Sequence, residues 1–178
     1  MTASHYCAQQ RFARKVAGMD TEIIKPFVDA TLKVLETMAF IKPTVGEPAH
    51  WDTCMPLGEV VGVVGLSNED ENIKGFLAIG FSESSIIQIV SSMLGEEYLT
   101  IVNEVREAAG EIANMISGQS RQALSSMGIK LQASLPSVIS GRDMTMDGSG
   151  KRPLLIVPFT IEKGSFMLGL CMEGFNVK

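Results

Sequence analysis

Apolar residues recur every three or four positions along two long stretches of the chain, and this spacing predicts helices. The first helix is expected to begin at Pro26, because the missing N–H of proline costs nothing at the first helical position, and to end before Pro43. Phe27, Thr31, Val34, Leu35 and Met38 recur along it at this spacing. The longest predicted helix runs from about Ile101 to Met127, with Gly128 just after it.

A shorter helix is predicted between these two, after Ser82. Serine is a good N-cap, Glu83 is acidic in the first turn, and Gly95 follows the last apolar positions, Met93 and Leu94. These features set both ends of the helix.

The remaining apolar runs are typical of strands. "GEVVGVVGLS" and "NIKGFLAIGFS" flank the acidic "NEDEN" and predict an antiparallel hairpin. A short strand near Ser137 to Ser140 and two closing strands, "LLIVPFTI" and "FMLGLCME", are expected after the long helix, with Pro158 placing the first of these at an edge or a bulge. The order helix, strands, helix, helix, strands predicts an α+β fold, with two or three helices packed on a largely antiparallel sheet.

Composition narrows the class of protein. A chain of 178 residues suits one domain, and it has no apolar run of the roughly 20 residues that cross a membrane. A net charge of -5 argues against a nucleic-acid partner, since phosphate backbones attract basic surfaces. The 3 cysteines are far apart and unpaired in sequence, which indicates neither a disulfide framework nor a zinc site and favours a cytoplasmic location.

Residues 1–18 differ from the rest of the chain, since Arg11, Arg14 and Lys15 occur there without an acidic residue. They lack the apolar core of a secretory signal. We expect a disordered or vector-derived leader before an internal start at Met19, and a single domain over residues 19–178.

Candidate chemistry lies on the long helix, whose two faces differ. At about 100° per residue, one stripe faces the sheet and consists of Val105, Ala109, Ile112, Ile116 and Ala123. The opposite side carries Glu104, Glu107, Glu111, Asn114, Gly118 and Arg121. Glu111 and Asn114 are neighbours on it at positions i and i+3, and Gly110 and Gly118 flank Asn114 by one turn on each side.

The simplest interpretation of this face is a solvated polar surface, but the glycines count against it. Glycine disfavours a helix by roughly 1 kcal/mol relative to alanine, so a merely solvated face would not favour it. A low surface around Asn114 would instead let a partner come close. No phosphate-binding glycine loop occurs, and no base is positioned for a serine nucleophile.

These residues resemble those of a known family. "GEIANMISGQSR", with Glu111 and Asn114 in an E-x-x-N arrangement and Pro136 downstream after "SL", is similar to the active-site helix of the CheC/CheX/FliY chemotaxis phosphatases, and specifically of its CheX branch. "KPFVDATLKVLETMAF" and "RPLLIVPFTIEKGSFMLGLCME" resemble the opening helix and closing strands of CheX, so that the resemblance covers about residues 20 to 175. Glu107 stands where the family usually has serine or aspartate.

The resemblance implies a CheC-like α+β layer and a phosphatase that acts on the aspartyl phosphate of a CheY-like response regulator. It implies that Asn114 orients the attacking water and Glu111 pairs with the receiver's lysine, while Glu107, Gly110, Gly118 and Arg121 contribute to docking. It implies no metal or cofactor of the protein's own, Mg²⁺ on the receiver, and a homodimer. A single site is expected, because Glu36 in the first helix has no asparagine three residues on.

Two alternatives stay open. The helix face could serve only to dock a receiver or a motor-switch protein, which would make the protein a non-catalytic adaptor. The surface around Trp51 could instead bind a small ligand, which would make it a sensor.

Overall fold

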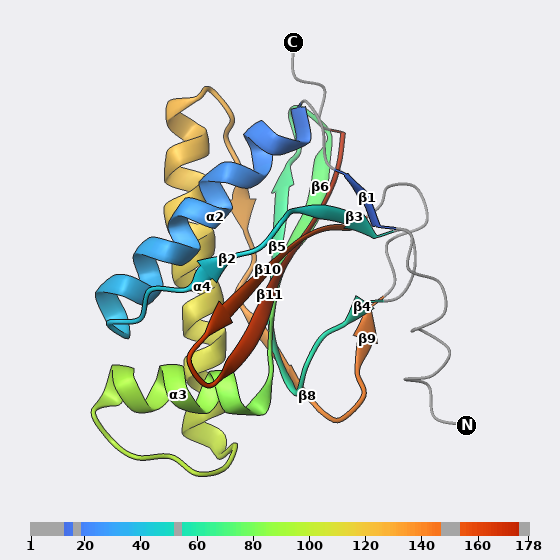
Figure 1. The fold of residues 1–178 in the computed structure, drawn as a ribbon. Coiled ribbons are helices and arrows are strands. Elements are labelled where there is room, and N and C mark those ends of the chain that lie inside the picture. Colours follow the sequence, from blue (N-terminus) through green and yellow to red (C-terminus); the bar gives the residue numbers. More distant parts are fainter. Residues whose placement is uncertain (1–12, 16–18, 52–54, 147–153, 175–178) are drawn as a thin grey trace.

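The computed structural model describes residues 13–15, 19–51, 55–146 and 154–174 as helices packed on a sheet (Figure 1). Three helices are present in these ranges: α2 (Met19–Met38), α3 (Glu83–Leu94) and α4 (Asn103–Ser126). The strands are β1 (Ala13–Lys15), β2 (Thr44–Val45), β3 (Ala49–Trp51), β4 (Met55–Pro56), β5 (Val60–Asn68), β6 (Ile73–Phe81), β7 (Gln132–Ala133), β8 (Ser137–Ser140), β9 (Thr145–Met146), β10 (Leu154–Ile161) and β11 (Gly164–Glu173).

The predicted hairpin is confirmed and forms the centre of the main sheet. β5 and β6 pair antiparallel, from Val60 opposite Phe81 to Asn68 opposite Ile73. β11 and then β10 extend the sheet beyond β6, and β3, β2 and β1 follow. On the other side, β5 pairs with two short strands, β7 and β8. Each pairing among the described strands is antiparallel, which confirms the α+β fold expected from the sequence.

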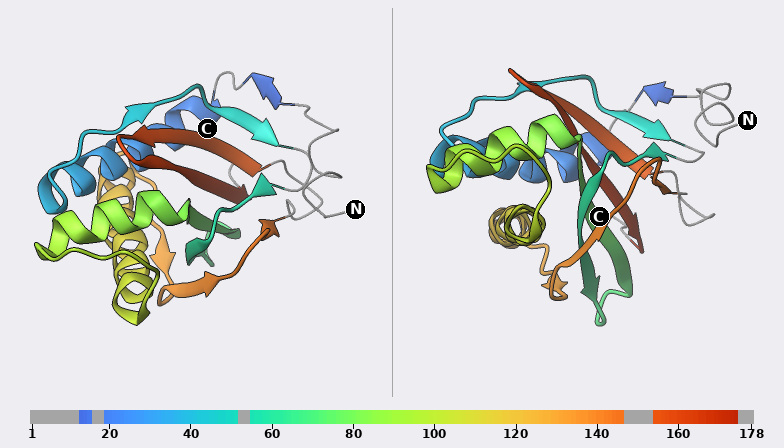
Figure 2. Two further views of the ribbon diagram at one scale, coloured as in Figure 1. Left: turned by 60° about the horizontal axis from the view of Figure 1, so that its bottom comes forward. Right: turned by 90° about the horizontal axis from the view of Figure 1, so that it is seen from below.

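The helices cover one face of this sheet (Figure 2). α2 packs beside α4, α4 lies against β5, and α3 packs against β11. The largest fully buried side chains of the core include Phe27, Phe81, Phe159 and Phe166, and the rings of Phe159 and Phe166 stack with their centroids 4.8 Å apart. A smaller buried cluster belongs to the opposite face and consists of Leu57, Val61, Ala78, Leu154, Ile156 and Cys171. Because apolar side chains are buried on both faces, β5 and β6 read as nearly continuous apolar runs.

Helices α3 and α4 match their predicted ends closely. Ser82 caps α3 by accepting a hydrogen bond from the backbone N–H of Ser85, and Gly95 ends it in the left-handed conformation with φ 68°. α4 is two residues shorter at its start than expected and ends at Ser126, ahead of Gly128.

The start predicted for the first helix is wrong. α2 begins at Met19 and contains Pro26 in its interior. Proline removes one helical hydrogen bond, but Ile24, on the turn before it, is only 2% exposed, and burial of such residues against the core holds that turn in place.

Two further expectations concern β1 and Pro158. Residues 13–15 were expected in a disordered leader, but they form β1 and pair with β3; residues 1–12 and 16–18 lie outside the described residues.

Pro158 lies in the gap between the pairings of β10 with β3 and with β2, where its carbonyl accepts a hydrogen bond from the N–H of Gly46 at 2.8 Å. The nitrogen of Pro158 faces the same side as its carbonyl, toward β2 and β3. Neither strand pairs with residue 158, so the missing N–H costs no hydrogen bond between strands.

Candidate functional site

Helix α4 carries the candidate site, and its sheet-facing side is buried. The buried residues are Val105, Ala109, Gly110, Ile112, Ala113, Ile116, Ser117, Ser120 and Leu124. The prediction was right for Val105, Ala109, Ile112 and Ile116, but wrong for Ala123, which is exposed. Leu124 takes the inward position in that turn, and Ala123 instead lines a groove between α4 and α2.

The predicted pair lies on the outer side of α4. Glu111 is exposed and Asn114 is half-buried, so neither is turned against the sheet. Within the described part of the chain, neither side chain makes a hydrogen bond or an ion pair. A carboxylate and a carboxamide one turn apart are thus both available to a partner.

The two glycines beside Asn114 differ in their surroundings. A Cβ on Gly118 would meet nothing within 4 Å, which fits the open surface expected there. A Cβ on Gly110 would lie 2.7 Å from Cγ2 of Val138 in β8, and Gly110 is buried. The reason for glycine at position 110 is therefore close packing of β8, and not the room for a partner that the sequence suggested.

The other predicted docking residues, Glu107 and Arg121, also differ. Glu107 is exposed. Arg121 is only partly exposed, and its Nη1 donates a hydrogen bond to the carbonyl of Leu131 at 3.4 Å. Arg121 therefore holds the chain after α4 against the helix, and any contact it makes with a partner would be secondary to this.

The segment of residues 131–140 lies beside α4, which sequence reasoning missed. In Figure 1 it runs along the helix next to β5, and Figure 2 shows α4 between this segment and α2. Two contacts tie β8 to the helix: Val138 packs on Gly110, and Arg106 Nε donates to Ser140 Oγ at 3.2 Å. Pro136 after "SL" and the strand at Ser137–Ser140 were noted in the sequence, but no local pattern placed them beside α4.

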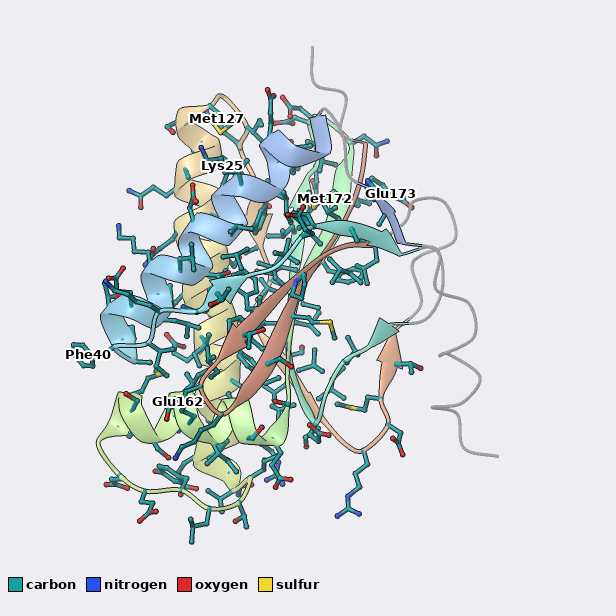
Figure 3. The ribbon with its side chains drawn as sticks, in the orientation of Figure 1. Lys25, Phe40, Met127, Glu162, Met172 and Glu173 are labelled. Atoms are coloured by element: carbon teal, nitrogen blue, oxygen red, sulfur yellow. The ribbon has the colours of Figure 1, made fainter. Side chains whose placement is uncertain are left out.

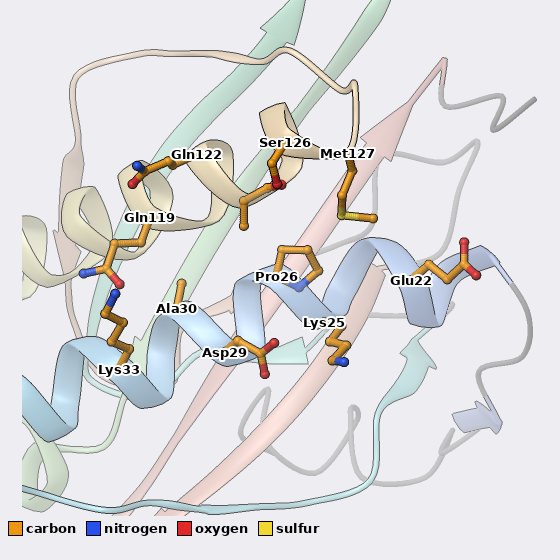
Figure 4. A pocket seen from close by; sticks show the side chains of 11 residues that line it. Glu22, Lys25, Pro26, Asp29, Ala30, Lys33, Gln119, Gln122, Ser126 and Met127 are labelled. Carbon is orange, nitrogen blue, oxygen red and sulfur yellow. The ribbon is translucent and has the colours of Figure 1, made fainter.

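A large open groove lies elsewhere, between α2 and α4 (Figure 4). Its volume is about 870 Å³, and Glu111 and Asn114 are not among its lining residues. Lys33 of α2 points toward Gln119 of α4 across it, and Lys25, Asp29 and Gln122 also line it (Figure 4). The candidate pair thus lies outside this groove, on the outer side of α4.

The first helix offers no second pair of this kind. Glu36 forms an ion pair with Lys42 at 3.0 Å, and the residue three positions on, Ala39, is fully buried just beyond the end of α2. The ligand surface considered around the side chain of Trp51 lies outside what the structure describes.

Two other features bear on function. In the described ranges, no group of three or more His, Cys, Asp or Glu side chains could hold a metal ion. None of the helices described is both long and apolar enough to cross a lipid bilayer.

Comparison with known proteins points to one family. The family model described as chemotaxis phosphatase CheX matches residues 60–160. The CheY-P phosphatase CheX of Thermotoga maritima is 28% identical over 136 residues, which cover 74% of this chain and 84% of that protein. The crystal structure of CheX from Desulfovibrio desulfuricans is 39% identical with a TM-score of 0.78, and the match covers 85% of this chain and 99% of that one.

A third relative shares the fold at lower identity. CheX of Borrelia burgdorferi, solved in a complex with CheY, BeF3 and Mg²⁺, is 24% identical with a TM-score of 0.72, over 84% of this chain and 97% of that one. The matched family region runs from β5 through α4 into β10 and includes the Glu111 and Asn114 pair. Because that region is more than half of the sequence, the chain belongs to the CheX family of chemotaxis phosphatases and is a phosphatase.

Proposed function

We propose that this protein hydrolyses the aspartyl phosphate of a CheY-like response regulator, with Asn114 and Glu111 as the two side chains it supplies. The relative from Thermotoga maritima is named a CheY-P phosphatase, and the relative from Borrelia burgdorferi was solved bound to CheY. Both names support a phosphorylated receiver as the substrate. The roles of the two residues rest on the geometry of α4.

The observation that carries the proposal is the carboxamide of Asn114 on the outer side of α4, which makes no hydrogen bond with a described residue. A side-chain amide is not a base at neutral pH, but its oxygen accepts and its nitrogen donates hydrogen bonds. Inserted into the receiver's site, Asn114 would hold one water in line with the phosphorus atom, the positioning role that a glutamine has in GTPases. Orientation alone lowers a barrier substantially, because the entropy of placing the water is lost before the reaction.

Glu111 would fix how the two proteins dock. Its carboxylate is exposed and has no cationic partner in the described part of the chain, so it is available to pair with the receiver's lysine. A charge-assisted hydrogen bond of this kind is shorter and stronger than a neutral one. Since Glu111 and Asn114 are one turn apart, this contact would also set the position of the carboxamide.

The reaction consumes one water. The water oxygen forms a bond to phosphorus as the bond from phosphorus to the aspartyl oxygen breaks, which restores the receiver's carboxylate and releases inorganic phosphate with the water's protons. The receiver contributes the Mg²⁺ and lysine that neutralise the phosphoryl oxygens. No covalent intermediate on this protein and no cofactor of its own are needed in this scheme.

The test is release of inorganic phosphate from a panel of phosphorylated CheY-type receivers. Asn114→Ala is expected to slow stimulated release by about 10²-fold or more, the scale of loss when one orienting or stabilising group is removed. Gln122→Ala is the matched control, because it removes an exposed carboxamide from the same helix two turns away and should leave the rate unchanged.

Two outcomes would contradict the proposal. Equal rates for wild type and Asn114→Ala would refute the role of the carboxamide. Saturable binding of a receiver without faster phosphate release would instead indicate an adaptor, which Glu107 in place of the usual serine or aspartate leaves room for.

The homodimer is proposed on the resemblance alone. Sedimentation equilibrium over a range of protein concentrations would test it, and a single monomeric mass throughout would refute it. The cytoplasmic location stays a prediction.

A further inference from the structure

The segment that leads into β8 runs along the part of α4 that carries Asn114. Along α4, Arg106 contacts Ser140, Gly110 contacts Val138, and Arg121 contacts Leu131, so the chain of residues 131–140 runs antiparallel to the helix. The four helical residues from Arg106 to Gly110 and the two strand residues from Ser140 to Val138 each rise about 6 Å. The helix and the strand therefore advance by the same distance between these two contacts. Interpolating from Gly110 to Arg121 places Asn114 opposite residues 135–136.

Leu135 stands out at this position. It is 88% exposed, the highest value among the exposed large apolar side chains of the described residues. A single exposed leucine is ordinary on a protein surface. What needs explanation is that this leucine is exposed on a loop that is held firmly.

Hydrogen bonds of Ser134 fix this loop to β5. The N–H of Ser134 donates to the carbonyl of Gly65 at 2.9 Å, and the N–H of Gly65 donates back to Ser134 Oγ at 2.9 Å. Ser134 Oγ in turn donates to the carbonyl of Leu135 at 2.9 Å, and Pro136 follows. A side chain presented on such a fixed loop loses little conformational freedom on binding, which is the usual property of an anchor at an interface.

The neighbouring helix surface supplies charge. Glu104, Glu107 and Glu111 are all exposed along the outer side of α4, and none of them forms an ion pair with a described residue. Glu104 is favoured by the positive end of the helix dipole. Glu107 and Glu111, four residues apart, repel each other and destabilise the helix, so their placement favours a role in binding a cation-bearing surface.

We propose that Leu135 and this row of three glutamates form the docking surface around Asn114, and that the receiver presents an apolar pocket to Leu135 and basic side chains to the glutamates. The inference rests on the proposed function, because it takes the phosphorylated receiver as the occupant. It adds to that function by assigning binding and catalysis to different residues. Leu135 and the glutamates bind the receiver, whereas Asn114 accelerates the reaction.

The experiment measures the Kd for a CheY-type receiver loaded with beryllofluoride and Mg²⁺, which mimics the phosphoryl group and is not hydrolysed. The receiver is the one that wild type dephosphorylates fastest. Leu135→Ala is expected to raise Kd and KM about 10-fold and to leave kcat unchanged, since truncating an anchor weakens binding on this scale. Phe40→Ala is the control, because Phe40 is 83% exposed but lies beyond the end of α2 (Figure 3), and its Kd should equal that of wild type.

Two further variants test how the surface works. Ser134→Ala keeps Leu135 but removes the hydroxyl that holds its loop, and it should raise Kd by a smaller factor. Glu107→Gln should slow association and reduce the dependence of Kd on salt, because exposed charges act mainly through steering that salt screens.

The outcomes separate this inference from the proposed function. An unchanged Kd for Leu135→Ala, together with a slow Asn114→Ala, would overturn the docking surface and leave the phosphatase mechanism intact. A raised Kd for Leu135→Ala with a normal Asn114→Ala rate would support the surface and refute the mechanism. If Leu135→Ala changed the oligomeric state instead of Kd, or if wild type bound no receiver, the docking surface would be refuted.

Discussion

Gly110 and Gly118, two turns apart on α4, predict opposite results for the same substitution. Alanine in place of glycine inside a helix is favourable by about 1 kcal/mol, because the unfolded chain has less freedom to lose. At Gly118 a Cβ would meet nothing within 4 Å, so Gly118→Ala should gain this amount in full. For a domain of this size, 1 kcal/mol raises the Tm by about 2–4 °C.

At Gly110 the same methyl group would be overpacked. A Cβ there would lie 2.7 Å from Cγ2 of Val138, and something must move. Valine is short and stiff about χ1, so the strain passes to β8. Overpacking costs about 1–3 kcal/mol, which offsets or exceeds the gain in helix propensity. Gly110→Ala should therefore be less stable than Gly118→Ala by about 1–3 kcal/mol.

Urea unfolding followed by circular dichroism measures both free energies of unfolding, provided the m-values agree. The control is Gly110→Ala combined with Val138→Ala, because the second change removes the obstructing methyl group. The pair should be more stable than the sum of the two single changes predicts, which is a coupling that a double-mutant cycle detects. Equal stabilities for Gly110→Ala and Gly118→Ala, or additivity in the cycle, would refute the packing argument.

Two other predictions concern the packing of α4 and a titration. Gly62→Ala should lower the free energy of unfolding by about 1–3 kcal/mol in the same urea experiment, because a Cβ there would lie 2.8 Å from a carbonyl oxygen of α4; unchanged stability would contradict it. Partial burial, followed by the charges of Glu96 and Glu104, raises the pKa of Tyr98 above its usual value of 10.0, so ultraviolet titration of a Tyr6→Phe variant should show a midpoint above that of free tyrosine. Because the folded state then holds this proton more tightly than the unfolded state, the contribution of Tyr98 to stability is complete below about pH 10 and is lost as pH rises through the folded pKa.

The sequence was sufficient for elements whose signals are local. Ser82 and Gly95 bound α3 through capping, and the hairpin of β5 and β6 could be predicted because two β-rich apolar runs flank the acidic turn residues. The outward position of Glu111 follows from helical periodicity alone. Each of these features depends on neighbours within a few positions along the chain.

Features that depend on tertiary contacts could not be predicted in the same way. Pro26 was taken as a helix start because burial of Ile24 cannot be seen from propensity. The reason for Gly110 lies 28 positions further on, in Val138, and no spacing rule links the two. For the candidate site, the sequence therefore identified the polar pair but not the loop that lies beside it.

The way α2 ends limits how a second site of the same kind could arise on this helix. Introducing asparagine three residues after Glu36 would place its amide at position 39, which is 0% exposed and lies past the last helical residue, Met38. The carbonyl of Ala39 also accepts a hydrogen bond from Ser92 of α3, so this backbone is already committed to holding two helices together. A second copy of the candidate pair at Glu36 would thus need a different end of α2, and substitution of residue 39 alone would not produce it.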